Sequence, residues 1–223
     1  MGEMIRLTAS DGHEFGAYLT TPVGKPRGGL IVGMEMYGVN DYLRGVCDDF
    51  AAAGYLTIAP RLFDRFEPDL TNPYDDVGSR RGKELSAIID HDQTMLDVTA
   101  AMERVRPAGK VAIMGFCFGG TVTWLAACRC DLDAGIAYYG SNMCDYPDEQ
   151  PRCPVICHVG DLDTAVPPAD VASFQEKHPA VHWNIYPGAQ HGFDNSTRTV
   201  RYHAAVTAQA RQRSLAFLRD QIG

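Results

Sequence analysis

A cysteine between two glycines is the residue of this sequence that most clearly suggests chemistry. Cys117 lies in Gly115-Phe116-Cys117-Phe118-Gly119-Gly120, between an apolar run at residues 111–114 and a helical pattern at residues 121–128. A strand that turns sharply into a helix leaves little room for Cβ atoms, so flanking glycines are typical of a nucleophile elbow. The partial positive charge at a helix N-terminus also favours a thiolate. Cys117 is therefore a candidate nucleophile, and the alternative is a small buried side chain beside a glycine-rich turn.

Two further residues are candidates for the partners that a thiol nucleophile needs. Asp163 and His191 each follow an apolar run that is typical of a buried strand. Loops that follow parallel strands meet at one edge of a sheet, where ligands bind. There His191 can take the proton of Cys117 while Asp163 orients the imidazole and stabilises its charged form. Taken singly, His191 also fits an ordinary loop histidine and Asp163 a turn residue, and Asp161 is an equally plausible carboxylate.

The elements that must position these residues alternate between strands and helices. The apolar runs predict strands over residues 3–8, 14–20, 29–34, 55–59, 111–114, 134–139, 155–159 and 182–186. Helical periodicity and capping residues predict helices over residues 40–53, 80–104 with a candidate break near 90–92, 121–128, 168–177 and 198–218. Residues 60–78 have no clean period and predict a long surface excursion near a pocket mouth. We expect one α/β domain over residues 1–223, with a mostly parallel central sheet of about seven to eight strands and helices on both faces.

Composition excludes several classes of partner. The 223 residues are 45% hydrophobic and 22% charged, with a formal net charge of -8. Nucleic acids and anionic membranes favour clustered Lys and Arg, so neither is expected as a partner. The seven cysteines lack the spacing of a disulfide framework or a zinc site, so no metal is expected. With no signal-like start and no apolar run of membrane-spanning length, we expect a cytoplasmic protein.

Five motifs together resemble the dienelactone hydrolase family, the cysteine-nucleophile branch of the α/β-hydrolases, whose members are carboxymethylenebutenolidase-like. The order of nucleophile, acid and histidine also matches that of α/β-hydrolases. The resemblance implies the α/β-hydrolase fold, and the Val166-Pro167 pair selects Asp163 over Asp161 as the triad acid. The motifs are Glu35-Met36-Tyr37-Gly38-Val39-Asn40, the Cys117 segment, Tyr138-Tyr139-Gly140, His158-Val159-Gly160-Asp161-Leu162-Asp163 and Ala189-Gln190-His191-Gly192-Phe193.

The resemblance also implies roles beyond the triad. In the family, the glutamate equivalent to Glu35 contacts the cysteine and helps to control its ionisation. The backbone N–H groups of Tyr37 and Phe118 are expected to form the oxyanion hole, which agrees with their places after two successive strands. No cofactor is implied.

The sequence departs from the family where a substrate carboxylate is bound. Asn195 stands where family members carry an arginine four residues after the triad histidine, and Ser79 and Lys83 align with a second arginine and a tyrosine. We expect Arg81 or Arg198 to line the pocket instead, and the alternative is that both are surface residues. Carboxylate binding would then be weaker or differently placed, with neutral esters hydrolysed at least as well as carboxylated ones.

The expected function is hydrolysis of a small-molecule ester or lactone in a small pocket, through a thioester acyl-enzyme on Cys117. One alternative is a general carboxylesterase or thioesterase with an unrelated substrate. Another is a thiol-sensing or binding homologue that no longer transfers acyl groups. We expect a monomer or a small homo-oligomer.

Overall fold

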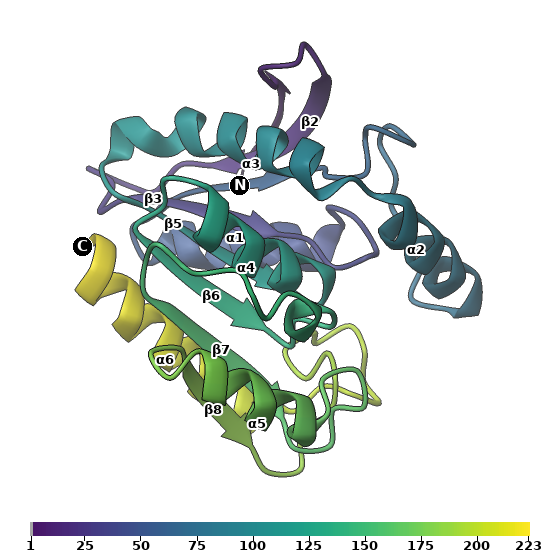
Figure 1. The fold of residues 1–223 in the computed structure, drawn as a ribbon. Helices are drawn as coiled ribbons and strands as arrows, with labels where there is room; N and C mark the ends of the chain where they lie inside the picture. Colours follow the sequence, from purple (N-terminus) through teal and green to yellow (C-terminus); the bar gives the residue numbers. More distant parts are fainter. Residues whose placement is uncertain (1) are drawn as a thin grey trace.

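The computed structural model describes residues 2–223, whose strands form an eight-stranded sheet with helices on both faces (Figure 1). Met1 of the expected domain lies outside the described residues. The strand order is β1-β2-β4-β3-β5-β6-β7-β8; β2 is antiparallel to both of its neighbours, and the other neighbouring strands are parallel. This confirms the predicted mostly parallel α/β sheet. The strands are β1 (Glu3–Thr8), β2 (Glu14–Thr20), β3 (Gly29–Gly33), β4 (Leu56–Pro60), β5 (Val111–Phe116), β6 (Ala134–Tyr138), β7 (Val155–Gly160) and β8 (His182–Tyr186).

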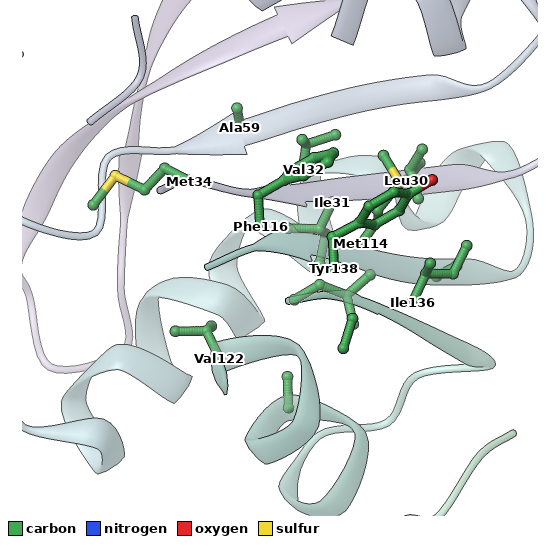
Figure 2. Close-up of a cluster of buried hydrophobic side chains, with 14 of the residues drawn as sticks. Leu30, Ile31, Val32, Met34, Ala59, Met114, Phe116, Val122, Ile136 and Tyr138 are labelled. Atoms are coloured by element: carbon green, nitrogen blue, oxygen red, sulfur yellow. The ribbon is translucent and has the colours of Figure 1, made fainter. Parts of the chain in front are cut away.

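The central strands β3, β5 and β6 are buried along their whole length. Both faces of a parallel sheet are covered by helices, which is why these strands appear in the sequence as unbroken apolar runs. Figure 2 shows the resulting core, in which side chains of the three strands pack together near Val122 of the following helix. This packing fixes the carboxyl ends of the strands, where the candidate residues begin.

The helices form two layers over the sheet (Figure 1). In one layer α3 packs beside α4, and Trp124 of α4 lies edge-on to Phe174 of α5, with ring centroids 4.9 Å apart. In the other, the Arg211 guanidinium of α6 lies 5.5 Å from the ring centroid of Phe50 in α1. The helices are α1 (Asp41–Ala52), α2 (Asp76–Ile88), α3 (His91–Val105), α4 (Phe118–Arg129), α5 (Pro168–Lys177) and α6 (Ala204–Ile222), with short 3-10 turns η1 (Arg106–Ala108) and η2 (Met143–Asp145).

Two helix boundaries test the sequence analysis. The break near residues 90–92 is confirmed: Asp90 caps α3, and its side chain accepts hydrogen bonds from the N–H groups of Asp92 and Gln93. The predicted start of the last helix at residue 198 is wrong, because α6 begins at Ala204. The backbone N–H groups of Arg201 and Tyr202 both donate to the Arg198 carbonyl, so turns occupy this segment.

The helix α2 projects at one side of the sheet (Figure 1) and packs against the turn after β3. A Cβ at Gly82 would overlap the carbonyl oxygen of Met36, so glycine permits this close approach. The Tyr37 hydroxyl lies 2.9 Å from the hydroxyl of Ser79, one turn earlier in the same helix. This places one face of α2 over the carboxyl edge of the sheet.

No helix in residues 2–223 combines the length and the apolar character that crossing a bilayer requires.

Candidate active site

The bend between β5 and α4 holds Cys117 in a conformation that side chains rarely adopt. Its φ is 54° and its ψ is -115°, a strained region that costs about 1–3 kcal/mol and occurs mainly at functional sites. The Cys117 N–H donates to the Tyr138 carbonyl of the next strand at 3.0 Å, which holds the bend against the sheet. A Cβ at Gly115 would overlap the backbone of Gly119, so the bend requires glycine there. The geometry is that of a nucleophile elbow.

The loops after β7 and β8 bring Asp163 and His191 together. His191 Nδ1 lies 2.9 Å from Asp163 Oδ2 and 3.1 Å from Oδ1. The buried carboxylate also accepts hydrogen bonds from the N–H groups of Ala165 and Val166, at 2.8 and 3.1 Å. These bonds fix the carboxylate, which in turn fixes the plane of the imidazole.

Asp161, the alternative carboxylate, is exposed and does not meet His191. Its side chain accepts a hydrogen bond from the Gly188 N–H at 2.7 Å, which stabilises the turn after β8.

Electrostatics favours a proton on His191. Burial alone would lower the pKa of His191, but the negative charges of Cys117 and Asp163 and the hydrogen bonds to both raise it to about 10. Cys117 and His191 both line one cavity, and the Cys117 Sγ lies 4.0 Å from the hydroxyl of Ser141. At near-neutral pH, this imidazole would therefore keep a proton transferred to it from the thiol.

Glu35 is buried just after the end of β3. Its Oε2 accepts hydrogen bonds from Asn195 Nδ2 at 2.8 Å and from the Tyr74 hydroxyl at 3.1 Å. Burial raises the pKa of Glu35, while the Asn195 hydrogen bond and the charges of Arg198 and His191 act in the opposite direction. Within the described residues no hydrogen bond joins Glu35 to Cys117, and the role of this carboxylate stays a prediction.

The backbone N–H groups expected to form the oxyanion hole belong to two residues that line the cavity, Tyr37 and Phe118. Phe118 is the first residue of α4, where N–H groups have no partner within the helix. Neither N–H donates a hydrogen bond within the part of the chain that the structure describes. Both remain available to an oxyanion, and their role stays a prediction.

Of the two arginines proposed for substrate binding, Arg198 lines the cavity. Its guanidinium lies 5.3 Å from the ring centroid of Tyr37 and 5.6 Å from that of Tyr74, so two aromatic rings support the cation. The turns before α6 aim it there.

Arg81 is not among the residues that line the cavity, which corrects the prediction for this side chain. It pairs with Glu67 at 2.6 Å and with Glu84 at 3.4 Å on the surface. The reason is helical geometry. Ser79 and Lys83 of α2 line the cavity, and Arg81, two positions after Ser79, lies on roughly the opposite face of the helix.

The cavity has a volume of about 670 Å³, within the usual range for sites that bury a drug-sized ligand and larger than the small pocket expected. Among the described residues, its walls carry three cations, Lys83, Arg198 and Arg201, and one carboxylate, that of Asp145. Among residues 2–223 none of the three cations has a carboxylate oxygen within 4.0 Å. The cavity is therefore locally basic in an acidic chain.

Residues of the site that the sequence analysis missed include Tyr74, Ser141, Asp145 and Arg201. Tyr74 lies in the irregular segment before α2, where no local pattern indicates its partners. Arg201 lies inside the last helix as it was predicted, so no sequence pattern placed it at the site. It lies in the turns before α6 in the structure.

Comparisons with known proteins define first the class and then the family. A crystal structure of a dienelactone hydrolase candidate from Klebsiella pneumoniae superposes with a TM-score of 0.82 at 28% identity, covering 96% of this chain and 98% of that one. A Pyrococcus furiosus esterase gives a TM-score of 0.72 at 16% identity, covering 100% of this chain and 93% of that one. The fold is that of the α/β-hydrolases, as predicted.

The model of the dienelactone hydrolase family matches residues 15–222. A carboxymethylenebutenolidase of Pseudomonas putida is 29% identical over 228 residues, which cover 97% of this chain and 95% of the relative. The chain belongs to the dienelactone hydrolase family. The family and the enzyme class predicted from the motifs, a hydrolase of carboxylic esters or lactones, are thereby confirmed.

Proposed function

We propose that the protein hydrolyses a carboxylic ester or lactone through a Cys117-His191-Asp163 triad and a thioester acyl-enzyme. The observation that carries the proposal is the Asp163–His191 pair, whose His191 lines the same cavity as a cysteine held at positive φ just before α4. The name of the Pseudomonas putida relative, a carboxymethylenebutenolidase, supports the same type of reaction.

The first half of the reaction transfers the acyl group. His191 takes the thiol proton, and the Cys117 sulfur attacks the carbonyl carbon. The carbonyl oxygen becomes an oxyanion that accepts hydrogen bonds from the backbone N–H groups of Tyr37 and Phe118. His191 then gives its proton to the leaving alkoxide oxygen as the C–O bond breaks, which leaves a thioester on Cys117.

The second half releases the acid. His191 removes a proton from water, and the resulting hydroxide attacks the thioester carbonyl through a second oxyanion. The C–S bond breaks, and the sulfur leaves as a thiolate beside the imidazolium. Asp163 keeps the Nδ1–H of His191 directed at itself in both halves, so that Nε2 is the nitrogen that exchanges protons.

We propose an anionic substrate, which replaces the expectation that neutral esters are hydrolysed at least as well as carboxylated ones. The guanidinium of Arg198 has no carboxylate partner in the described chain and lies on the rings of Tyr37 and Tyr74, while Arg201 lines the same cavity. A planar guanidinium pairs a carboxylate through two parallel hydrogen bonds. This supports a carboxylate site placed differently from that of the family, since Asn195 is engaged with Glu35.

Glu35 is proposed to influence the protonation of His191 and Cys117 through its charge. Its buried carboxylate interacts electrostatically with His191 and Arg198 and is held by Asn195. A negative charge there favours the imidazolium and opposes a second negative charge on the nearby thiol.

The experiment that tests the proposal is mass spectrometry of the intact protein after brief exposure to p-nitrophenyl acetate. We expect an acetyl adduct that maps to Cys117 and decays with turnover. Cys117→Ala should lose both adduct and turnover, whereas Cys153→Ala, which changes a partly buried thiol elsewhere, should retain both. Turnover that persists in Cys117→Ala would refute the proposal. A stable protein that binds esters without an adduct would favour a binding or thiol-sensing homologue.

A further inference from the structure

The cavity extends beyond the reacting thiol, and Thr121 in the first turn of α4 lines it. Ser141 lies beside Cys117, and five residues later the Tyr146 carbonyl accepts a hydrogen bond from Trp124 Nε1 at 3.2 Å. Cys117 and Trp124 are seven residues apart, which is about 10 Å along a helix. The segment from Ser141 to Tyr146 therefore forms a wall of about that length.

The helix α2 forms the opposite wall. Ser79 lies at the catalytic end, where its hydroxyl meets that of Tyr37, and Ala87, which also lines the cavity, lies eight residues or about 12 Å further along. His91 follows α2, and its ring lies edge-on to Tyr146 with centroids 5.5 Å apart. The two walls thus meet at the His91–Tyr146 contact, far from the thiol.

The distal half of the cavity offers hydrogen bonds of both kinds. Lys83 provides an ammonium group with no carboxylate within 4.0 Å among residues 2–223, and Asp145 provides a carboxylate, one oxygen of which accepts from Asn142 Nδ2 at 2.8 Å. His91 also lines the cavity, and its buried Nδ1 has no hydrogen-bond partner in the described chain. Burial and the charge of Arg129 lower the pKa of His91, which keeps the ring neutral.

We propose that the region around Lys83, His91 and Asp145 is a subsite for a hydroxyl-bearing group of an extended ester substrate. A hydroxyl both donates and accepts, which matches an ammonium, a carboxylate and a neutral imidazole in the lining of one cavity. Lys83 and Asp145 contribute one charge of each sign to this lining, so an uncharged polar group fits better than a second anion. The proposal rests on the proposed function, because the distance is measured from the thiol that reacts.

The distance determines the probe. A span of about 10 Å corresponds to about eight bonds of an extended chain. We therefore compare p-nitrophenyl 8-hydroxyoctanoate with p-nitrophenyl nonanoate, in which a methyl group replaces the hydroxyl. A second pair, 8-hydroxyoctyl acetate and nonyl acetate, carries the same ends on the alcohol. p-Nitrophenyl acetate is too short to reach the subsite and reports the basal reaction.

We expect the hydroxylated member of one pair to have the higher kcat/KM, by about tenfold. Lys83→Met and His91→Phe should each reduce this ratio toward one and leave acetate hydrolysis unchanged, while His91→Gln, which keeps a hydrogen-bonding side chain, should retain part of it. His182→Phe, an exposed histidine on β8, is the matched control and should keep the full ratio.

Two results separate the proposals. Suppose that the wild type hydrolyses the acetate, and that neither Lys83→Met nor His91→Phe changes the kcat/KM ratio in either pair. This result would overturn the subsite and leave the proposed function intact. Absence of any ester hydrolysis by the wild type would overturn the proposed function, and the subsite with it.

Discussion

Asp163→Asn tests the proposed role of Asp163 as triad acid because it changes little else. The side chain is buried, and its Oδ1 accepts hydrogen bonds from the N–H groups of Ala165 and Val166. An amide oxygen can keep both bonds, so the turn after β7 should persist. The amide NH₂ then faces His191 Nδ1, where the carboxylate had accepted. Two donors cannot meet, so the imidazole is driven to the tautomer with its proton on Nε2.

The magnitude follows from the proton transfer that this tautomer prevents. An imidazole with a proton on Nε2 cannot accept the thiol proton, and the same substitution in a serine triad lowers the rate by about 10⁴-fold. That factor corresponds to about 5 kcal/mol of barrier. The charge and hydrogen bond of Asp163 also help to raise the pKa of His191 to about 10. Without this charge and this hydrogen bond, the imidazolium loses its proton at lower pH. The pH profile of Cys117 alkylation by iodoacetamide should therefore change in Asp163→Asn.

The assay is steady-state hydrolysis of p-nitrophenyl acetate, with thermal unfolding as the check on folding. Asp161→Asn is the matched control, since this exposed carboxylate only accepts from the Gly188 N–H. We expect Asp161→Asn to lie within about threefold of the wild type, less than the effect of one ordinary hydrogen bond. Wild-type activity to within tenfold in a folded Asp163→Asn protein would refute the role of this carboxylate, as would a larger loss in the control.

Three further predictions concern charge. Glu35→Gln should shift iodoacetamide labelling of Cys117 to lower pH, since a like charge is removed, and superimposable profiles would exclude an electrostatic role. Arg198→Ala should raise KM by about tenfold for p-nitrophenyl hemisuccinate but not for the neutral butyrate, whereas Arg81→Ala should leave both unchanged. Burial lowers the pKa of His158 to about 3, so its contribution to the free energy of unfolding is full above about pH 6.5 and is lost as the pH falls toward 3. Between pH 7 and 5, urea unfolding should therefore show that the free energy of unfolding falls less steeply in His158→Gln than in the wild type, by about 1.4 kcal/mol per pH unit below pH 6.5. Parallel curves for the two proteins would contradict this.

The fold could be predicted because its elements have strong local patterns. The predicted bounds of β8 and α5 agree with the structure, since apolar alternation and a proline at the helix start are local features. The start of α6 could not be predicted in this way. Residues 198–203 contain no Gly or Pro that would mark the end of a helix, but the Arg198 guanidinium lies over the rings of Tyr37 and Tyr74, more than 120 residues earlier in the chain.

The candidate site likewise has a part that local sequence patterns predict and a part that they do not. The structure brings Asp163 to His191 and places His191 with Cys117 in one cavity, because each residue follows a parallel strand and parallel strands end at one edge. The hydrogen bond between Glu35 and Asn195 joins residues 160 positions apart, which no local pattern indicates. The rotation of α2, which turns Arg81 outward, is set by the close contact of a glycine with the turn after β3.

One residue connects the parts of the site that bind different portions of a substrate. The hydroxyl of Tyr37 meets Ser79 on the α2 wall, its ring supports the Arg198 guanidinium, and its backbone N–H is one of the two expected oxyanion donors. A carboxylate on Arg198 and a carbonyl at the Cys117 sulfur would therefore be positioned against the same turn after β3. Because the chain has a net charge of -8, long-range attraction does not favour an anion, and charges further than about 8 Å are largely screened at physiological salt. Selection for an anionic ester must then come from short-range pairing at Arg198, on a turn that also fixes the reacting carbonyl.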